Sequence, residues 1–115
     1  MENVVEKKSF EFAVKIVNVT RELRLSGCEY SLANQLMRSG TSIGANISEA
    51  QQAQSKKDFI AKMSIALKEA NETRYWIRLL KETRSMQSKI SDELIVQTNE
   101  LISLLSKIIK SAKEK

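Results

Sequence analysis

Hydrophobic residues recur along this chain at alternating steps of three and four, the period of one face of an α-helix. In the first segment, from about residue 6 to 24, the repeat is formed by Phe12, Ile16, Val19 and Leu23. A break at residues 25–28 follows, where Gly27 is able to adopt the left-handed conformation that ends a helix. A second helix is therefore predicted from about residue 28 to 53.

The third and fourth segments show the same periodicity more strictly. Ser55 and Asp58 resemble a capping box and predict the start of a third helix. Its seam over three heptads is formed by Phe59, Met63, Ala66, Ala70, Thr73, Ile77 and Leu80. After a polar turn at residues 83–88, Ser88 or Ser91 is expected to cap a fourth helix. Its main seam is formed by Leu94, Thr98, Leu101, Leu105, Ile108 and Ala112, with a second seam of Ile95, Ile102 and Ile109 beside it.

The composition supports an all-helical fold. The chain has 115 residues, no proline and three glycines, whereas β-proteins need turn residues throughout. Short breaks between four helices favour an antiparallel up-down-up-down four-helix bundle, formed by residues 1–115 as one domain. Gly40 and Gly44, four residues apart inside the second helix, indicate a close helix approach or a ligand near the backbone, and close packing is the preferred interpretation.

A polar stripe runs along the flank of the second helix. At about 100° per residue its members share an arc of roughly 80° next to the apolar face. They are Gln35, Arg38, Ser42, Asn46 and Glu49. Polar groups beside a core need partners, so the stripe predicts either structural bonds or a ligand site. We prefer a structural role, with Arg38 paired to Glu49 or to Glu72 of the third helix, buried and mutually bonded. An open pocket lined by Arg38, Asn46 and Glu49 would instead indicate an enzyme.

Positive charge is concentrated in one part of the chain. Residues 56–89 hold nine basic and four acidic residues, whereas the remainder holds ten of each, so the net charge of +5 arises there. Arg74, Arg78 and Lys81 share one helix face, Arg84 follows one turn later, and Lys56 and Lys57 lie at the helix start. These six residues are candidate phosphate contacts. The alternatives are a solvated helix face or a surface for an acidic protein. The adjacent Tyr75 and Trp76 suit RNA stacking, although a subunit contact is preferred for Trp76.

Several classes of function are disfavoured. Without histidine, and with Cys28 as the single cysteine, the usual zinc sites and the commonest general base are missing. We therefore expect no metal, no cofactor and no enzymatic activity. No apolar run is long enough to span a membrane, and the polar first residues do not resemble a signal peptide. One unpaired cysteine fits a reducing cytoplasm.

Two blocks of sequence resemble a known family. The first runs from Gln35 to Glu49 and contains Ser-Ile-x-x-Asn-Ile-x-Glu; the second runs from Lys68 to Leu80 and contains Glu-Thr-x-Tyr-Trp. Together they are similar to the bacterial four-helix 23S rRNA intervening-sequence proteins, whose superfamily includes the accessory variability protein of diversity-generating retroelements. Ala50 stands where the family usually has glycine, and the proline often found before the second helix is absent.

The resemblance implies small antiparallel bundles that assemble as homopentamer rings, and retroelement relatives that engage nucleic acid through a basic surface. We therefore expect a non-enzymatic cytoplasmic oligomer that binds RNA or a nucleoprotein through its third helix. The alternative is an interaction scaffold that contacts an acidic protein.

Overall fold

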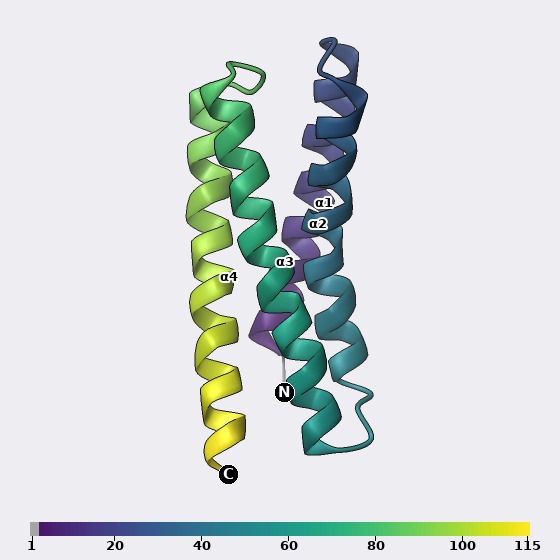
Figure 1. Cartoon of the computed structure of the whole chain (residues 1–115), viewed down its shortest axis with the longest axis vertical. Helices are drawn as coiled ribbons and strands as arrows, with labels where there is room; N and C mark the ends of the chain where they lie inside the picture. Colours follow the sequence, from purple (N-terminus) through teal and green to yellow (C-terminus); the bar gives the residue numbers. More distant parts are fainter. Residues whose placement is uncertain (1–2) are drawn as a thin grey trace.

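The computed structural model describes residues 3–115, which form four α-helices and no strand (Figure 1). The helices are α1 (Val4–Leu25), α2 (Tyr30–Ala50), α3 (Lys56–Glu82) and α4 (Ser88–Glu114). Consecutive helices run in opposite directions and build a rod of 47 × 24 × 20 Å. The predicted all-α four-helix bundle is confirmed. None of the helices in residues 3–115 has a stretch long and apolar enough to span a bilayer.

The helix ends follow the expected capping chemistry at two of the four starts. The side chain of Asn3 accepts a hydrogen bond from the Glu6 backbone N–H (3.1 Å), and the Ser55 hydroxyl accepts one from Asp58 (3.0 Å). Gly27 adopts the predicted left-handed conformation, with φ of 89°. The two side-chain bonds satisfy backbone N–H groups that a helix start leaves unpaired, and the left-handed Gly27 ends α1.

The predicted cap of the fourth helix is wrong. The residue before α4 is Gln87, which makes no side-chain capping bond, and Ser88 is already the first helical residue. Ser91 is fully buried, and its hydroxyl donates to the Ser88 carbonyl (3.0 Å). An N-cap residue precedes the helix and bonds its first N–H groups, whereas Ser91 is already the fourth residue of α4 and its own N–H donates to the Gln87 carbonyl (3.0 Å).

The core follows the predicted seams closely. From Met63 to Leu80 every predicted seam residue of α3 is buried, whereas Phe59 at its start is half-buried. In α4 the seam is buried from Leu94 to Leu105 and then shifts from Ile108 to Ile109. A straight helix has 3.6 residues per turn, so a repeat of 3.5 drifts around the axis and the next residue takes over.

Glycine lets α1 and α2 approach closely, as predicted. A Cβ atom placed on Gly40 would lie 2.8 Å from Cγ2 of Ile16, a fully buried side chain of α1. At Gly44 the nearest atom would be the backbone oxygen of Ser9, at 3.2 Å. The two glycines therefore form the closest part of the α1–α2 interface.

The bundle is uneven around its circumference. Helix α3 packs extensively against both α2 and α4, whereas α1 packs mainly against α2 and touches α4 far less. Two exposed ion pairs bridge the thin α1–α4 edge, Lys8 with Glu100 and Lys15 with Glu93 (3.5 Å). Such exposed pairs contribute little stability, so α1 is held chiefly by α2.

We predict that Gly40→Ala destabilises the protein. The added methyl overlaps Ile16, which is branched at Cβ and enclosed on all sides, and overpacking of a core costs about 1–3 kcal/mol. The gain in helix propensity, about 1 kcal/mol, offsets part of this cost. Urea unfolding followed by circular dichroism at fixed protein concentration is expected to show a net loss of unfolding free energy of up to about 2 kcal/mol.

Gly44→Ala is the matched control, because its methyl needs only a shift of a few tenths of an ångström. Its change in unfolding free energy should stay within about 1 kcal/mol of zero. Equal stability of the Gly40→Ala protein and the unmodified protein would contradict the close approach.

Candidate nucleic-acid interface and polar network

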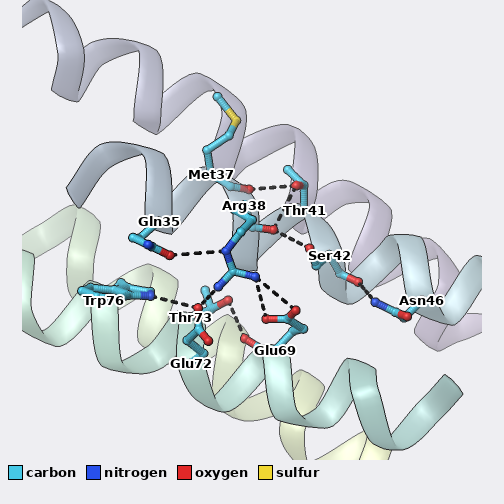
Figure 2. A network of polar contacts seen from close by, with 10 residues as sticks. All are labelled: Gln35, Met37, Arg38, Thr41, Ser42, Asn46, Glu69, Glu72, Thr73 and Trp76. Atoms are coloured by element: carbon cyan, nitrogen blue, oxygen red, sulfur yellow. Dashed lines mark hydrogen bonds and ion pairs between the residues drawn. The ribbon is translucent and has the colours of Figure 1, made fainter. Parts of the chain in front are cut away.

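Arg38 of α2 reaches across to α3, where its guanidinium contacts two carboxylates (Figure 2). Nη1 donates to both carboxylate oxygens of Glu69, at 3.3 and 3.2 Å, and Nη2 forms an ion pair with Glu72. Within α2, Nε donates to Oε1 of Gln35 (3.3 Å). Charge-assisted hydrogen bonds of this kind are stronger than neutral ones, so Arg38 ties α2 to α3.

The network continues along α3. The indole Nε1–H of Trp76 donates to the same Glu72 carboxylate (3.2 Å), and the Thr73 hydroxyl donates to the Glu69 carbonyl (2.7 Å). The ring of Trp76 is half-buried and packs against the core of its own protomer. Tyr75, which contacts Trp76 edge to face, is 57% exposed. Tyr75 is therefore more available than Trp76 for contact with another molecule.

Of the remaining members of the stripe, Ser42 and Asn46 bond within α2, whereas Glu49 contacts α3. Ser42 Oγ donates to the Arg38 carbonyl (2.6 Å), and Asn46 Nδ2 donates to the Ser42 carbonyl (2.8 Å). Glu49 pairs with Lys62 (3.3 Å) and not with Arg38. Two members of the stripe therefore connect α2 to α3: Arg38 through Glu69 and Glu72, and Glu49 through Lys62.

The network is less buried than the sequence suggested. The side chains of Arg38, Glu72 and Glu69 are 45%, 33% and 17% exposed. The cost of about 3–5 kcal/mol for stranding a buried charge therefore does not apply. An exposed ion pair contributes about 0.2–1 kcal/mol to the free energy of unfolding. We expect a somewhat larger contribution from this network, because its bonds are connected and Glu69 is well covered.

The cations of the α3 basic face, defined as Arg74, Arg78 and Lys81, differ in their surroundings. Arg74 donates to the side-chain oxygens of Asn99 in α4 (2.8 Å) and Asn71 (3.0 Å). Lys81 donates to Asp92 of α4 (2.8 Å), and this bond raises the pKa of Lys81. Arg78 is exposed and takes part in no ion pair among residues 3–115. Two of these three cations are therefore already bonded to other side chains.

Arg84 does not extend the α3 basic face, contrary to the helical spacing. Helix α3 ends at Glu82, and Arg84 has φ of 59° in the turn beyond it. The Thr83 N–H bonds back to Leu79 and the Ser85 N–H to Leu80, which closes the helix end. A residue with positive φ turns the chain away from the helical path, so helical periodicity does not place Arg84.

Lys56 and Lys57 lie far from the α3 basic face. At 1.5 Å per residue, the 17 steps from Lys57 to Arg74 span about 25 Å along α3. Both lysines stand at the positive end of the helix dipole, where a cation is unfavourable. The six candidate phosphate contacts therefore form at least two separate groups.

The structure places further lysines beside Lys56 and Lys57. The start of α3 and the end of α4 lie at the same end of the bundle (Figure 1). Residues 56–59 and 106–115 together carry six lysines and two acids, and all six lysines are exposed. We call this group the lysine end; its lysines are Lys56, Lys57, Lys107, Lys110, Lys113 and Lys115. No ion pair within residues 3–115 involves any of them.

An open hollow of about 450 Å³ lies within the lysine end. Its apolar floor comes from Phe59 of α3 with Ile108 and Ala112 of α4, and the lysines that line it are Lys56, Lys107 and Lys115. The α4 lysines were not among the predicted phosphate contacts, because they lie in the part of the chain outside residues 56–89, and that part holds equal numbers of basic and acidic residues. Their spacing of three, from residue 107 to 113, was the available signal.

Little in the described residues suggests covalent or metal chemistry. Burial, followed by the nearby Glu29 charge, raises the pKa of the Cys28 thiol, which disfavours the reactive thiolate. Within residues 3–115 no three His, Cys, Asp or Glu side chains lie close enough together to hold a metal ion.

The sequence profile of the family described as 23S rRNA-intervening sequence protein matches residues 1–107. The chain belongs to this family. The resemblance in the polar stripe and in the Tyr75–Trp76 block is thereby confirmed.

A solved relative supports the same assignment. The crystal structure of a protein with unknown function from the S23 ribosomal protein family of Bacteroides thetaiotaomicron is 50% identical to this chain. The superposition has a TM-score of 0.90 and covers 92% of this chain and 98% of the other. A comparison with curated proteins gave no match.

We predict that Arg38→Gln destabilises the bundle by about 1–2 kcal/mol, because Glu69 and Glu72 lose their shared cation and repel each other. The loss should shrink in 1 M NaCl, where charges are screened. Lys62→Gln is the control, since it breaks a pair whose Glu49 partner is 62% exposed. Equal unfolding free energies for the two variants would contradict the role given to Arg38.

Proposed function

We propose that this protein is a non-enzymatic, cytoplasmic oligomer that binds RNA or a nucleoprotein through basic surfaces that include α3. The observation that carries the proposal is the charge distribution: the whole excess of +5 lies in residues 56–89, most of which form α3. The family description connects its members with an intervening sequence of 23S rRNA, which is itself a polyanion. Clustered cations on a helical surface are the usual electrostatic footprint of nucleic-acid binding.

Assembly into a homopentamer ring is part of the proposal. Large apolar side chains are exposed on different helices: Phe10 (68%) and Val14 (47%) on α1, Tyr75 (57%) on α3 and Val96 (66%) on α4. A ring needs two different surfaces on each protomer, and these groups supply candidates for both. Five copies would raise the charge to about +25 and strengthen the attraction for phosphates.

Sedimentation equilibrium tests the assembly. We expect the mass of five chains for the unmodified protein and a smaller particle for Phe10→Glu, because a buried charge in the contact is costly. Glu11→Lys, at the adjacent exposed position, is the control for a charge change outside the apolar group. A stable monomer in the unmodified protein would refute the ring.

RNA binding is tested by filter binding of a structured RNA across salt concentrations. Because phosphate contacts release counterions, affinity should fall steeply, by about 10³-fold or more between 50 and 200 mM salt if six phosphates are contacted. The double variant Arg78→Glu/Arg84→Glu should bind several-fold more weakly and keep its circular dichroism spectrum, since neither residue forms an ion pair within residues 3–115.

No association with RNA at low salt would refute the proposal and favour an interaction scaffold for an acidic protein. If the double variant binds RNA as tightly as the unmodified protein, Arg78 and Arg84 are not part of the interface, and the RNA is bound through other residues.

A further inference from the structure

We propose that the lysine end is the surface on which this protein holds single-stranded RNA, with a base over the hollow at Phe59 and phosphates on the surrounding lysines. The inference rests on the proposed function and names both the contact surface and the form of RNA. It adds Lys107, Lys110 and Lys113 of α4, and Lys115 directly after α4, to the candidate phosphate contacts.

The cations of the lysine end differ from those of the α3 basic face in whether they are already bonded to other side chains. Arg74 and Lys81 are bonded to Asn99 and Asp92, and a phosphate must compete with those partners. The six lysines of the lysine end form no ion pair within residues 3–115, so a phosphate meets them directly. They outnumber the two local acids, Asp58 and Glu114, by four charges.

The other acids of α4, apart from Glu114, lie elsewhere along the helix. Asp92, Glu93 and Glu100 pair with Lys81, Lys15 and Lys8 respectively. Charge along α4 is therefore separated: the acids in its first half are neutralised by α1 and α3, while the lysines in its last turns remain available. The sequence total of ten basic and ten acidic residues outside 56–89 conceals this separation.

The residues that line the hollow favour a single strand of RNA over a duplex. Its floor is the half-buried ring of Phe59 with Ile108 and Ala112, and lysines from both helices stand around it. An unpaired base offers a flat face that stacks on an aromatic ring while its phosphates meet nearby cations. Bases inside a duplex are already stacked on each other, and an acidic peptide offers carboxylates without such a flat face.

The test uses a fluorescein-labelled U15 oligoribonucleotide and the full-length protein. The variant Lys56→Gln/Lys107→Gln/Lys110→Gln removes three charges from the lysine end and should weaken binding at least about tenfold at 50 mM KCl. The slope of log affinity against log salt should become shallower by about 2, the value for three lost contacts on a single strand.

The matched control, Arg21→Gln/Lys68→Gln/Lys89→Gln, removes the same charge from exposed positions elsewhere. It should change affinity less than about threefold, because distant surface charges are screened. A control loss as large as that of the lysine-end variant would mean that only net charge matters, and would overturn the proposal.

The stacking contact has its own readout. Phe59→Leu keeps an apolar floor but removes the ring, and should weaken U15 binding about fivefold or more without changing the salt slope. Ultraviolet crosslinking of U15 followed by mass spectrometry should identify Phe59. Tyr30 is the internal control, since it is 72% exposed and the start of α2 lies at the opposite end of the bundle from the end of α4 (Figure 1). Crosslinks at Tyr30 in place of Phe59 would refute the stacking contact.

The outcomes separate the two proposals. If the unmodified protein fails to bind U15 and structured RNA at 50 mM KCl, the proposed function fails and this inference falls with it. If the unmodified protein binds U15 and the lysine-end variant binds equally well, this inference alone fails. If 15-residue poly-glutamate displaces U15 at equal charge concentration, the surface accepts any polyanion chain and the assignment to RNA is overturned.

Discussion

The packing of α3 between α2 and α4 determines the rest of this structure. Its buried seam consists largely of small or flexible side chains, such as Ala66, Ala70 and Met63, which let two neighbours approach one helix. Antiparallel packing on both sides then decides which ends meet: the start of α3 lies beside the end of α4 (Figure 1). The charged surfaces of the protein follow from that pairing, because residues about 50 positions apart in sequence become neighbours.

Polar contacts add to the apolar packing by fixing how α2 and α3 are placed relative to each other. Arg38 connects α2 to Glu69 and Glu72 of α3 on the flank of the core, where its carboxylate partners keep partial access to water (Figure 2). An interior location would have imposed a large desolvation cost, and full exposure would have left the contact weak. The partly covered position allows one guanidinium to fix the relative placement of two helices.

The fold was predictable because its determinants are local or periodic. The seams of α3 and α4, the cap at Ser55 and the left-handed Gly27 are all specified within a few residues of sequence. The candidate site was less predictable, because it depends on which helices become neighbours. From the sequence, Glu49 and Glu72 were both possible partners of Arg38. In the folded chain Arg38 contacts Glu72 and also Glu69. Glu49 instead pairs with Lys62.

Two further differences have the same origin. Arg84 does not lie on the predicted helix face, because the backbone geometry at a helix end does not follow from the periodicity of side chains. The α4 lysines were overlooked because counting charge by sequence segment cannot register that the acids of α4 are paired across helix interfaces. In both cases the decisive information was a contact or a backbone angle outside the repeat.

Antiparallel packing gathers lysines of α3 and α4 that form no ion pair within residues 3–115 into one surface, and we propose that this surface binds an RNA strand. Hydrogen–deuterium exchange with and without U15 tests it most directly, since helix termini fray and gain protection when a ligand orders them. We expect slower exchange in residues 55–62 and 104–115, with no change in the middle of α1. Unchanged exchange in both segments while U15 is bound would contradict it.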